Sequence, residues 1–140
     1  MTGDASEGRA AQEMAGPAPR ELIQAVAQFN EGDYFGAHET LEELWRREHG
    51  RIRELYQGII QIAVGCHHRE RANPRGARLC FERGLARVVA FQPVCLGLDI
   101  RQMVVDVEQA LADLAAGSRA GSARPRIALY DSSSASNGAG

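Results

Sequence analysis

The sequence predicts an all-α protein, a compact bundle of about five helices with a central apolar helix near residues 51–72. Three observations favour this fold class. Apolar residues recur at the three- and four-residue spacing of a helix face in several successive segments. Asp, Asn, Pro and Gly, which begin or end helices, stand between these segments. No segment shows the convincing apolar–polar alternation of a β-strand.

The first predicted helix covers residues 20–30, in which Leu22, Val26 and Phe29 lie at helical spacing. The second covers residues 33–48 and starts with an aspartate, a preferred N-cap residue. A glycine soon after each helix provides a stop. Because the connection between the two helices is short, we expect them to pack as antiparallel neighbours.

The third predicted helix, residues 51–72, is apolar around nearly its whole circumference, as is typical of a helix at the centre of a bundle. Pro74 suits the first turn of a fourth helix that ends near residue 91. Residues 92–98 are expected to form a linker, and a capping aspartate begins a fifth helix at residues 99–116. A helical-repeat solenoid is the alternative, although few similar units are available to stack.

The chain has 140 residues, which corresponds to one ordinary domain, and its 44% apolar and 24% charged residues are typical of a globular protein. Residues 1–18 are expected to form a mobile tail and residues 19–117 the helical domain. Residues 118–140 are expected to form a C-terminal extension with a disordered last ten residues. Within it, residues 123–130 are short, extended and apolar enough to pack against the bundle.

No stretch reaches the roughly 18 apolar residues that span a bilayer, and the N-terminus lacks the apolar core of a secretory signal. We therefore expect a cytoplasmic protein without a membrane partner. Three cysteines without a C-x-x-C pair argue against a disulfide framework. Self-association into a homo-oligomer fits a small apolar bundle, but no sequence feature specifies it.

The formal net charge of −2 argues against nucleic acid as a partner. A local arginine cluster does follow the third predicted helix. Neighbouring glutamates dilute this cluster, and no aromatic residues are interleaved to stack on bases. The cluster comprises Arg69, Arg71, Arg75 and Arg78.

A group of polar residues falls on the apolar faces of the second and third predicted helices. His38 and Glu42 are four residues apart and therefore share one helix face, which also carries aromatic side chains. Buried amides and imidazoles need hydrogen-bond partners, so we expect these groups to meet inside the bundle. The candidate cluster comprises Tyr34, His38, Glu39, Glu42, Trp45, Gln57, Gln61, His67 and His68.

Two functions fit this cluster. The main hypothesis is a structural, interaction or small-ligand-binding domain in which the cluster fixes the helix register or frames a small pocket. The alternative is a metal-dependent, hydrolase-like enzyme, because HETLE resembles the H-E-x-x-H zinc motif. A divalent metal would then have His38, Glu42 and His68 (or His67) as its ligands. His38 and Glu42 can also act as a general acid and base without metal.

Three blocks, FNEGDYFGAHETLEELW, LYQGIIQIAVGCHH and NPRGARL, resemble in order the signature segments of the domain-of-unknown-function 309 family. The resemblance runs from about Phe29 to Leu85, with a looser echo in PRIAL near the end. It implies a small, all-helical, mainly bacterial protein with no established activity, and therefore no catalytic residues to transfer. Ala72 is a departure, because the family often has glycine before this asparagine.

Overall fold

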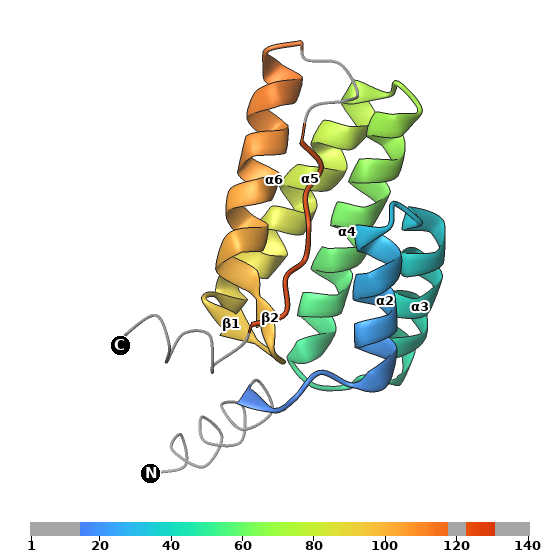
Figure 1. Cartoon of the computed structure of the whole chain (residues 1–140), viewed down its shortest axis with the longest axis vertical. Coiled ribbons are helices and arrows are strands. Elements are labelled where there is room, and N and C mark those ends of the chain that lie inside the picture. Colours follow the sequence, from blue (N-terminus) through green and yellow to red (C-terminus); the bar gives the residue numbers. More distant parts are fainter. Residues whose placement is uncertain (1–14, 118–122, 131–140) are drawn as a thin grey trace.

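The computed structural model describes residues 15–117 and 123–130 (Figure 1). Most of the predicted mobile tail and all of the predicted disordered last ten residues lie outside these ranges. Within them, the protein is a compact helical bundle, as predicted. Its helices are α2 (Arg20–Asn30), α3 (Tyr34–Arg47), α4 (Ile52–Glu70), α5 (Pro74–Val88), the short 3-10 helix η1 (Val89–Phe91) and α6 (Ile100–Ala115). Of the helices in the described ranges, none is both long and apolar enough to cross a membrane.

Side-chain caps fix where three of the helices begin. Asp33 accepts a hydrogen bond from the Gly36 N–H at 3.0 Å and starts α3, in agreement with the sequence analysis. Asn73 caps α5 in the same way at 3.1 Å, and Asp99 caps α6 at 2.9 Å. Each cap satisfies a backbone donor that the first helical turn leaves without a partner.

Helix α4 is the central helix, with α3 on one side and α5 on the other (Figure 1). Glycines allow α5 to approach α4 closely. A Cβ atom on Gly84 would lie 2.8 Å from the Gly58 carbonyl oxygen, and one on Gly65 would lie 2.6 Å from the Phe81 ring. These contacts hold α4 and α5 at a fixed separation, which sets the position of the α5 side chains beside α4.

The segment predicted as a linker contains a β-hairpin, so that prediction is wrong. Strands β1 (Val94–Cys95) and β2 (Leu98–Asp99) pair antiparallel. The two residues between them, Leu96 and Gly97, have φ values of 50° and 74°. Positive φ at both positions is the geometry of a type I′ turn, which matches the twist of paired strands.

Residues 123–130, here called the C-terminal segment, run along the bundle and contact parts of the chain far away in sequence (Figure 1). Asn30 donates to the Ile127 carbonyl at 2.8 Å and accepts from the Ile127 N–H at 2.9 Å. The Asp99 N–H donates to the Ala128 carbonyl at 2.9 Å, and Leu129 forms a bridge with Leu98. The Ile127 side chain is 2% exposed and completes the core.

Candidate functional site

An open polar groove lies over α4 and is here called the polar groove. Its volume is about 550 Å³. One stripe of α4 forms the floor, because residues three or four apart share a helix face. The floor comprises Arg53, Glu54, Gln57, Ile60, Gln61 and Val64.

The neighbouring helices form the walls of the polar groove. Helix α3 contributes His38, Glu42 and Trp45, at positions i, i+4 and i+7 of one face. Helix α5 contributes Arg87 from the opposite side. The groove therefore combines an imidazole, carboxylates, amides and guanidinium groups with an aromatic ring and two aliphatic side chains.

Two side-chain contacts organise the α3 wall. His38 Nε2 lies 3.5 Å from Glu42 Oε2, and both side chains are about one-third exposed. The Arg53 guanidinium lies 3.8 Å above the Trp45 ring and donates from Nε to the Trp45 carbonyl at 3.1 Å. The first contact is a solvent-screened pair, and the second is a cation–π contact that holds the tryptophan in place.

The floor contains polar groups without protein partners. Neither the Gln57 nor the Gln61 side-chain amide makes a hydrogen bond to any residue in the described ranges. Both amides are partly exposed, so water reaches them. In contrast, Glu54 is engaged by Arg87, whose Nη1 donates to Glu54 Oε2 at 2.9 Å.

The structure places five residues of the predicted cluster in this groove: His38, Glu42, Trp45, Gln57 and Gln61. Their location differs from the prediction, because the cluster lies in an open groove and not inside the bundle. The buried face of α3 is instead formed by Tyr34, Ala37, Leu41 and Leu44. His38 lies beside that face, where one-third of its side chain remains in contact with solvent.

The other members of the predicted cluster lie elsewhere. Tyr34 is 3% exposed and packs edge-on against Phe29, with ring centroids 5.3 Å apart. Glu39 is exposed outside the polar groove. His67 and His68 lie in the last turn of α4, where His68 Nδ1 is 3.2 Å from Asn73 Nδ2. Phe35, the residue after Tyr34, is 65% exposed.

The predicted metal ligands are not assembled. Across residues 15–117 and 123–130, no group of three or more His, Cys, Asp or Glu side chains is arranged to hold a metal ion. His38 and Glu42 line the groove together, whereas His68 is not among its lining residues.

The cysteines are poor candidates for nucleophiles. Burial raises the pKa of Cys66 to about 12 and that of Cys95 to about 11, and it also raises the pKa of Cys80. A thiol attacks as its thiolate, so these groups remain protonated and unreactive at neutral pH. None of the three lines the polar groove.

The predicted arginine cluster does not form one surface. Arg69 is only 7% exposed, and its guanidinium lies 5.9 Å from the centroid of the Phe81 ring. Its Nη2 atom donates to the Ala123 carbonyl at 3.5 Å. Arg69 therefore helps to hold the start of the C-terminal segment.

Sequence reasoning did not identify three charged residues of the polar groove. Arg53 lies four residues before Gln57, so the same helical spacing that links Gln57 to Gln61 was a usable signal for it. Glu54, three residues before Gln57, carried the same signal, whereas Arg87 on another helix carried none. Their pairing depends on how α4 and α5 are aligned, which is a property of the tertiary structure.

The fold and the groove define a class, small helical-bundle proteins with an open polar groove over the central helix. Residues 22–80 match the family described as "Domain of unknown function (DUF309)". This match spans α2, α3, α4 and the start of α5, and it confirms the resemblance found in the sequence.

Two relatives are bacterial proteins. The "Uncharacterized protein YpuF" of Bacillus subtilis (strain 168) is 39% identical over 62 residues, which are 43% of this chain and 36% of that protein. An "Uncharacterized protein" of Aquifex aeolicus (strain VF5) is 26% identical over 91 residues, 64% of this chain and 27% of that protein. The matches thus cover little more than a third of the first relative and little more than a quarter of the second. Neither name describes an activity, and the function is unestablished.

Proposed function

We propose that this chain is a binding domain whose polar groove holds a small ligand rich in hydrogen-bonding groups. The observation that carries the proposal is the pair of Gln57 and Gln61 amides, which have no partner among the described residues and lie one helical turn apart. Each amide has donors and an acceptor to offer, so two of them suit hydroxyl or amide groups of a ligand. The groove volume of about 550 Å³ is in the range of small-molecule sites.

The walls of the groove support the same ligand class. His38 and Glu42 face the floor with further donors and acceptors. Trp45, Ile60 and Val64 supply apolar area against which the carbon skeleton of a ligand would pack. A purely structural role would leave fewer of these polar groups open to solvent, because a seam that fixes helix register pairs its own members.

Trp45 offers a direct test, because it is the only tryptophan in the chain and lines the groove. We would titrate the full chain with a panel of sugars, amino acids and nucleosides and follow Trp45 fluorescence. Saturable changes should weaken in the double variant Gln57→Ala/Gln61→Ala, with Kd raised about tenfold or more, since each lost hydrogen bond contributes about 1 kcal/mol.

The matched control is Gln24→Ala/Gln109→Ala, which removes two exposed glutamines from other helices and should leave Kd unchanged. Equal weakening in both double variants would contradict the proposal, as would a panel that leaves the fluorescence of Trp45 unchanged. A second copy of the chain in the groove would be recognised as self-association in sedimentation experiments.

A metal-dependent hydrolase is the second candidate, favoured by the accessible His38–Glu42 contact of 3.5 Å. Elemental analysis of untagged protein purified without chelators, beside His38→Ala, separates the two candidates. The ligand-binding proposal expects no stoichiometric metal in either sample, since no three His, Cys, Asp or Glu side chains among the described residues are arranged to hold a metal ion. Stoichiometric zinc, manganese or iron that disappears in His38→Ala would favour the hydrolase.

A further inference from the structure

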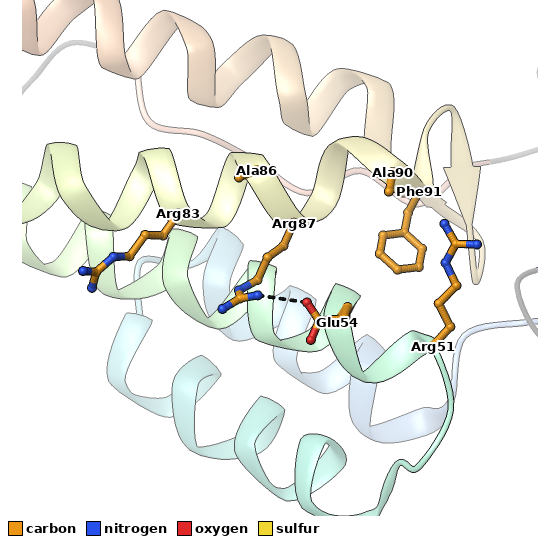
Figure 2. A pocket seen from close by; sticks show the side chains of 7 residues that line it. All are labelled: Arg51, Glu54, Arg83, Ala86, Arg87, Ala90 and Phe91. Carbon is orange, nitrogen blue, oxygen red and sulfur yellow. Dashed lines mark hydrogen bonds and ion pairs between the residues drawn. The ribbon is translucent and has the colours of Figure 1, made fainter.

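A second hollow lies between α4 and the end of α5 and includes the Glu54–Arg87 pair (Figure 2). Its volume is about 490 Å³. Three guanidinium groups line it, those of Arg51, Arg83 and Arg87, and we call it the arginine pocket. It shares Glu54 and Arg87 with the polar groove, but its other lining residues are different.

The arginine pocket carries a surplus of positive charge. Glu54 is its one acidic lining residue and is already paired with Arg87 at 2.9 Å. Arg51 and Arg83 have no ion pair with any carboxylate in the described part of the chain. Arg51 instead lies 5.6 Å from the centroid of the Phe91 ring. Three arginines and one glutamate give the pocket two more positive than negative charges, although the chain as a whole has a net charge of −2.

One wall of the pocket is apolar. Phe91, Ala86 and Ala90 contribute carbon atoms, and no uncharged polar side chain lines the hollow. Figure 2 shows Arg51 beside the Phe91 ring and Arg87 reaching toward Glu54. Arg83 lies closer to the start of α5, on the side of Arg87 away from Phe91. A ligand that fits this arrangement has a strongly anionic group and a carbon skeleton beside it.

We propose that the arginine pocket binds a phosphate group. Guanidinium is the side-chain group that best matches the oxygens of phosphate, because its planar N–H donors bind two oxygens at once. The surplus of two positive charges would neutralise the two negative charges of a phosphate monoester dianion. A long polyanion fits less well, since the acidic Glu54 lies at the middle of the row of arginines (Figure 2).

The test is direct binding to the full chain at constant ionic strength, by calorimetry, with inorganic phosphate and phenyl phosphate as probes. We expect both to bind with saturation. Tighter binding of phenyl phosphate would assign an organic phosphate whose skeleton contacts Phe91, and equal affinity would assign free phosphate. No saturable binding of either probe would overturn the proposal.

Variants locate the site. Arg51→Gln/Arg83→Gln leaves the Glu54–Arg87 pair intact and should raise Kd at least about tenfold, since charge-assisted hydrogen bonds are lost. Its control, Arg71→Gln/Arg75→Gln, removes two exposed arginines near the other end of α4 and should change Kd less than twofold. An equal loss of phosphate affinity in both double variants would indicate diffuse electrostatic attraction and would contradict the proposal.

Glu54→Gln gives an independent result in the opposite direction. It removes the carboxylate that competes for Arg87, so phosphate should bind several-fold more tightly. Unchanged or weaker binding in Glu54→Gln would contradict a site that includes Arg87. The Glu54→Gln experiment does not depend on whether the double arginine variant folds. It is measured by calorimetry and not by Trp45 fluorescence, so its outcome is separate from that of the polar-groove test.

Discussion

At the scale of single residues, the ionisable side chains of Tyr34 and Cys66 lie near each other in the core. Their exposed fractions are 3% and 1%. Burial raises the pKa of Tyr34 to about 12, and the neighbouring Cys66 adds to this shift. Burial also raises the pKa of Cys66 to about 12 against the opposing effect of Arg69. Tyr56, on the same central helix as Cys66, also has its pKa raised to about 12 by burial.

These pKa shifts predict that the protein loses stability in alkali. Between about pH 9 and 12 the unfolded chain releases protons that the folded core retains, so rising pH favours unfolding. The contribution of Cys66 is fully present below pH 9 and should fall by about 2–3 kcal/mol between pH 9 and 11, at about 1.4 kcal/mol per pKa unit. Urea unfolding at a series of pH values measures this decline.

The composition makes that experiment easy to interpret. All sixteen basic residues are arginine, which stays charged throughout this range, and no lysine titrates. Cys66→Ala removes one of the shifted groups, so the slope of unfolding free energy against pH should be shallower in this variant. An identical slope in the variant would mean that ionisation of Cys66 does not contribute to the loss of stability in alkali.

The candidate site shows how far reasoning from individual residues extends. Helical spacing was enough to group His38, Glu42 and Trp45, because all three lie on one helix and their relation is local. Their exposure could not be predicted in the same way. It depends on the rotation of α3 about its own axis, which is set by the burial of Tyr34 and Leu41 against other helices.

At the scale of elements, the end of α4 has an unfavourable residue. Ala72 has a φ of 57°, in the left-handed region that costs a residue with a Cβ atom about 1–2 kcal/mol. The Ala72 N–H nevertheless donates to the Arg69 carbonyl at 3.1 Å and helps to close the helix. This is the position at which the family resemblance implied glycine.

Ala72→Gly should therefore stabilise the protein. The relief of backbone strain exceeds the greater conformational entropy that glycine has in the unfolded chain, for a net gain of about 0.5–1 kcal/mol. Thermal unfolding measures the change. The same substitution at Ala112, an exposed position inside α6, should instead cost about 1 kcal/mol through helix propensity. A loss of stability at both positions would contradict the argument.

Helices were predicted with nearly correct limits because their signals are local. Periodicity and capping residues marked α2 through α6, and only the ends shifted by a few residues. The hairpin was missed for a physical reason. Its strands have two residues each, too few to show alternation, and its turn begins with Leu96 where Asn or Asp would be the usual signal.

At the scale of the whole molecule, the C-terminal segment joins parts of the chain that are remote in sequence. Asn30 and Ile127, which exchange two hydrogen bonds, are 97 residues apart. The segment also pairs with the hairpin, through the contact between Leu98 and Leu129. The sequence indicated only that residues 123–130 are apolar enough to pack. Their partners could not be read from local patterns.

Asn30→Ala should release the C-terminal segment without unfolding the helices. It leaves the partly buried N–H and carbonyl of Ile127 without partners, at a cost of about 1–3 kcal/mol. At a pH well below 9, hydrogen exchange of the Ile127 amide should accelerate more than that of amides in the middle of α4, which sense only the loss of global stability. The control is Gln109→Ala, which removes an exposed side-chain hydrogen bond. Unchanged protection of Ile127 in Asn30→Ala would contradict this role.

The long-range contact between Asn30 and Ile127 also bears on how the protein is made. A ribosome adds residues in order, so α2 and α3 are complete long before Ile127 is synthesised. Until that residue emerges, the core position that it fills stays open and exposes apolar surface of the partly made bundle. We therefore expect the core to close only after residue 127 has emerged, and codon changes that slow synthesis between α6 and residue 127 should prolong the exposed state.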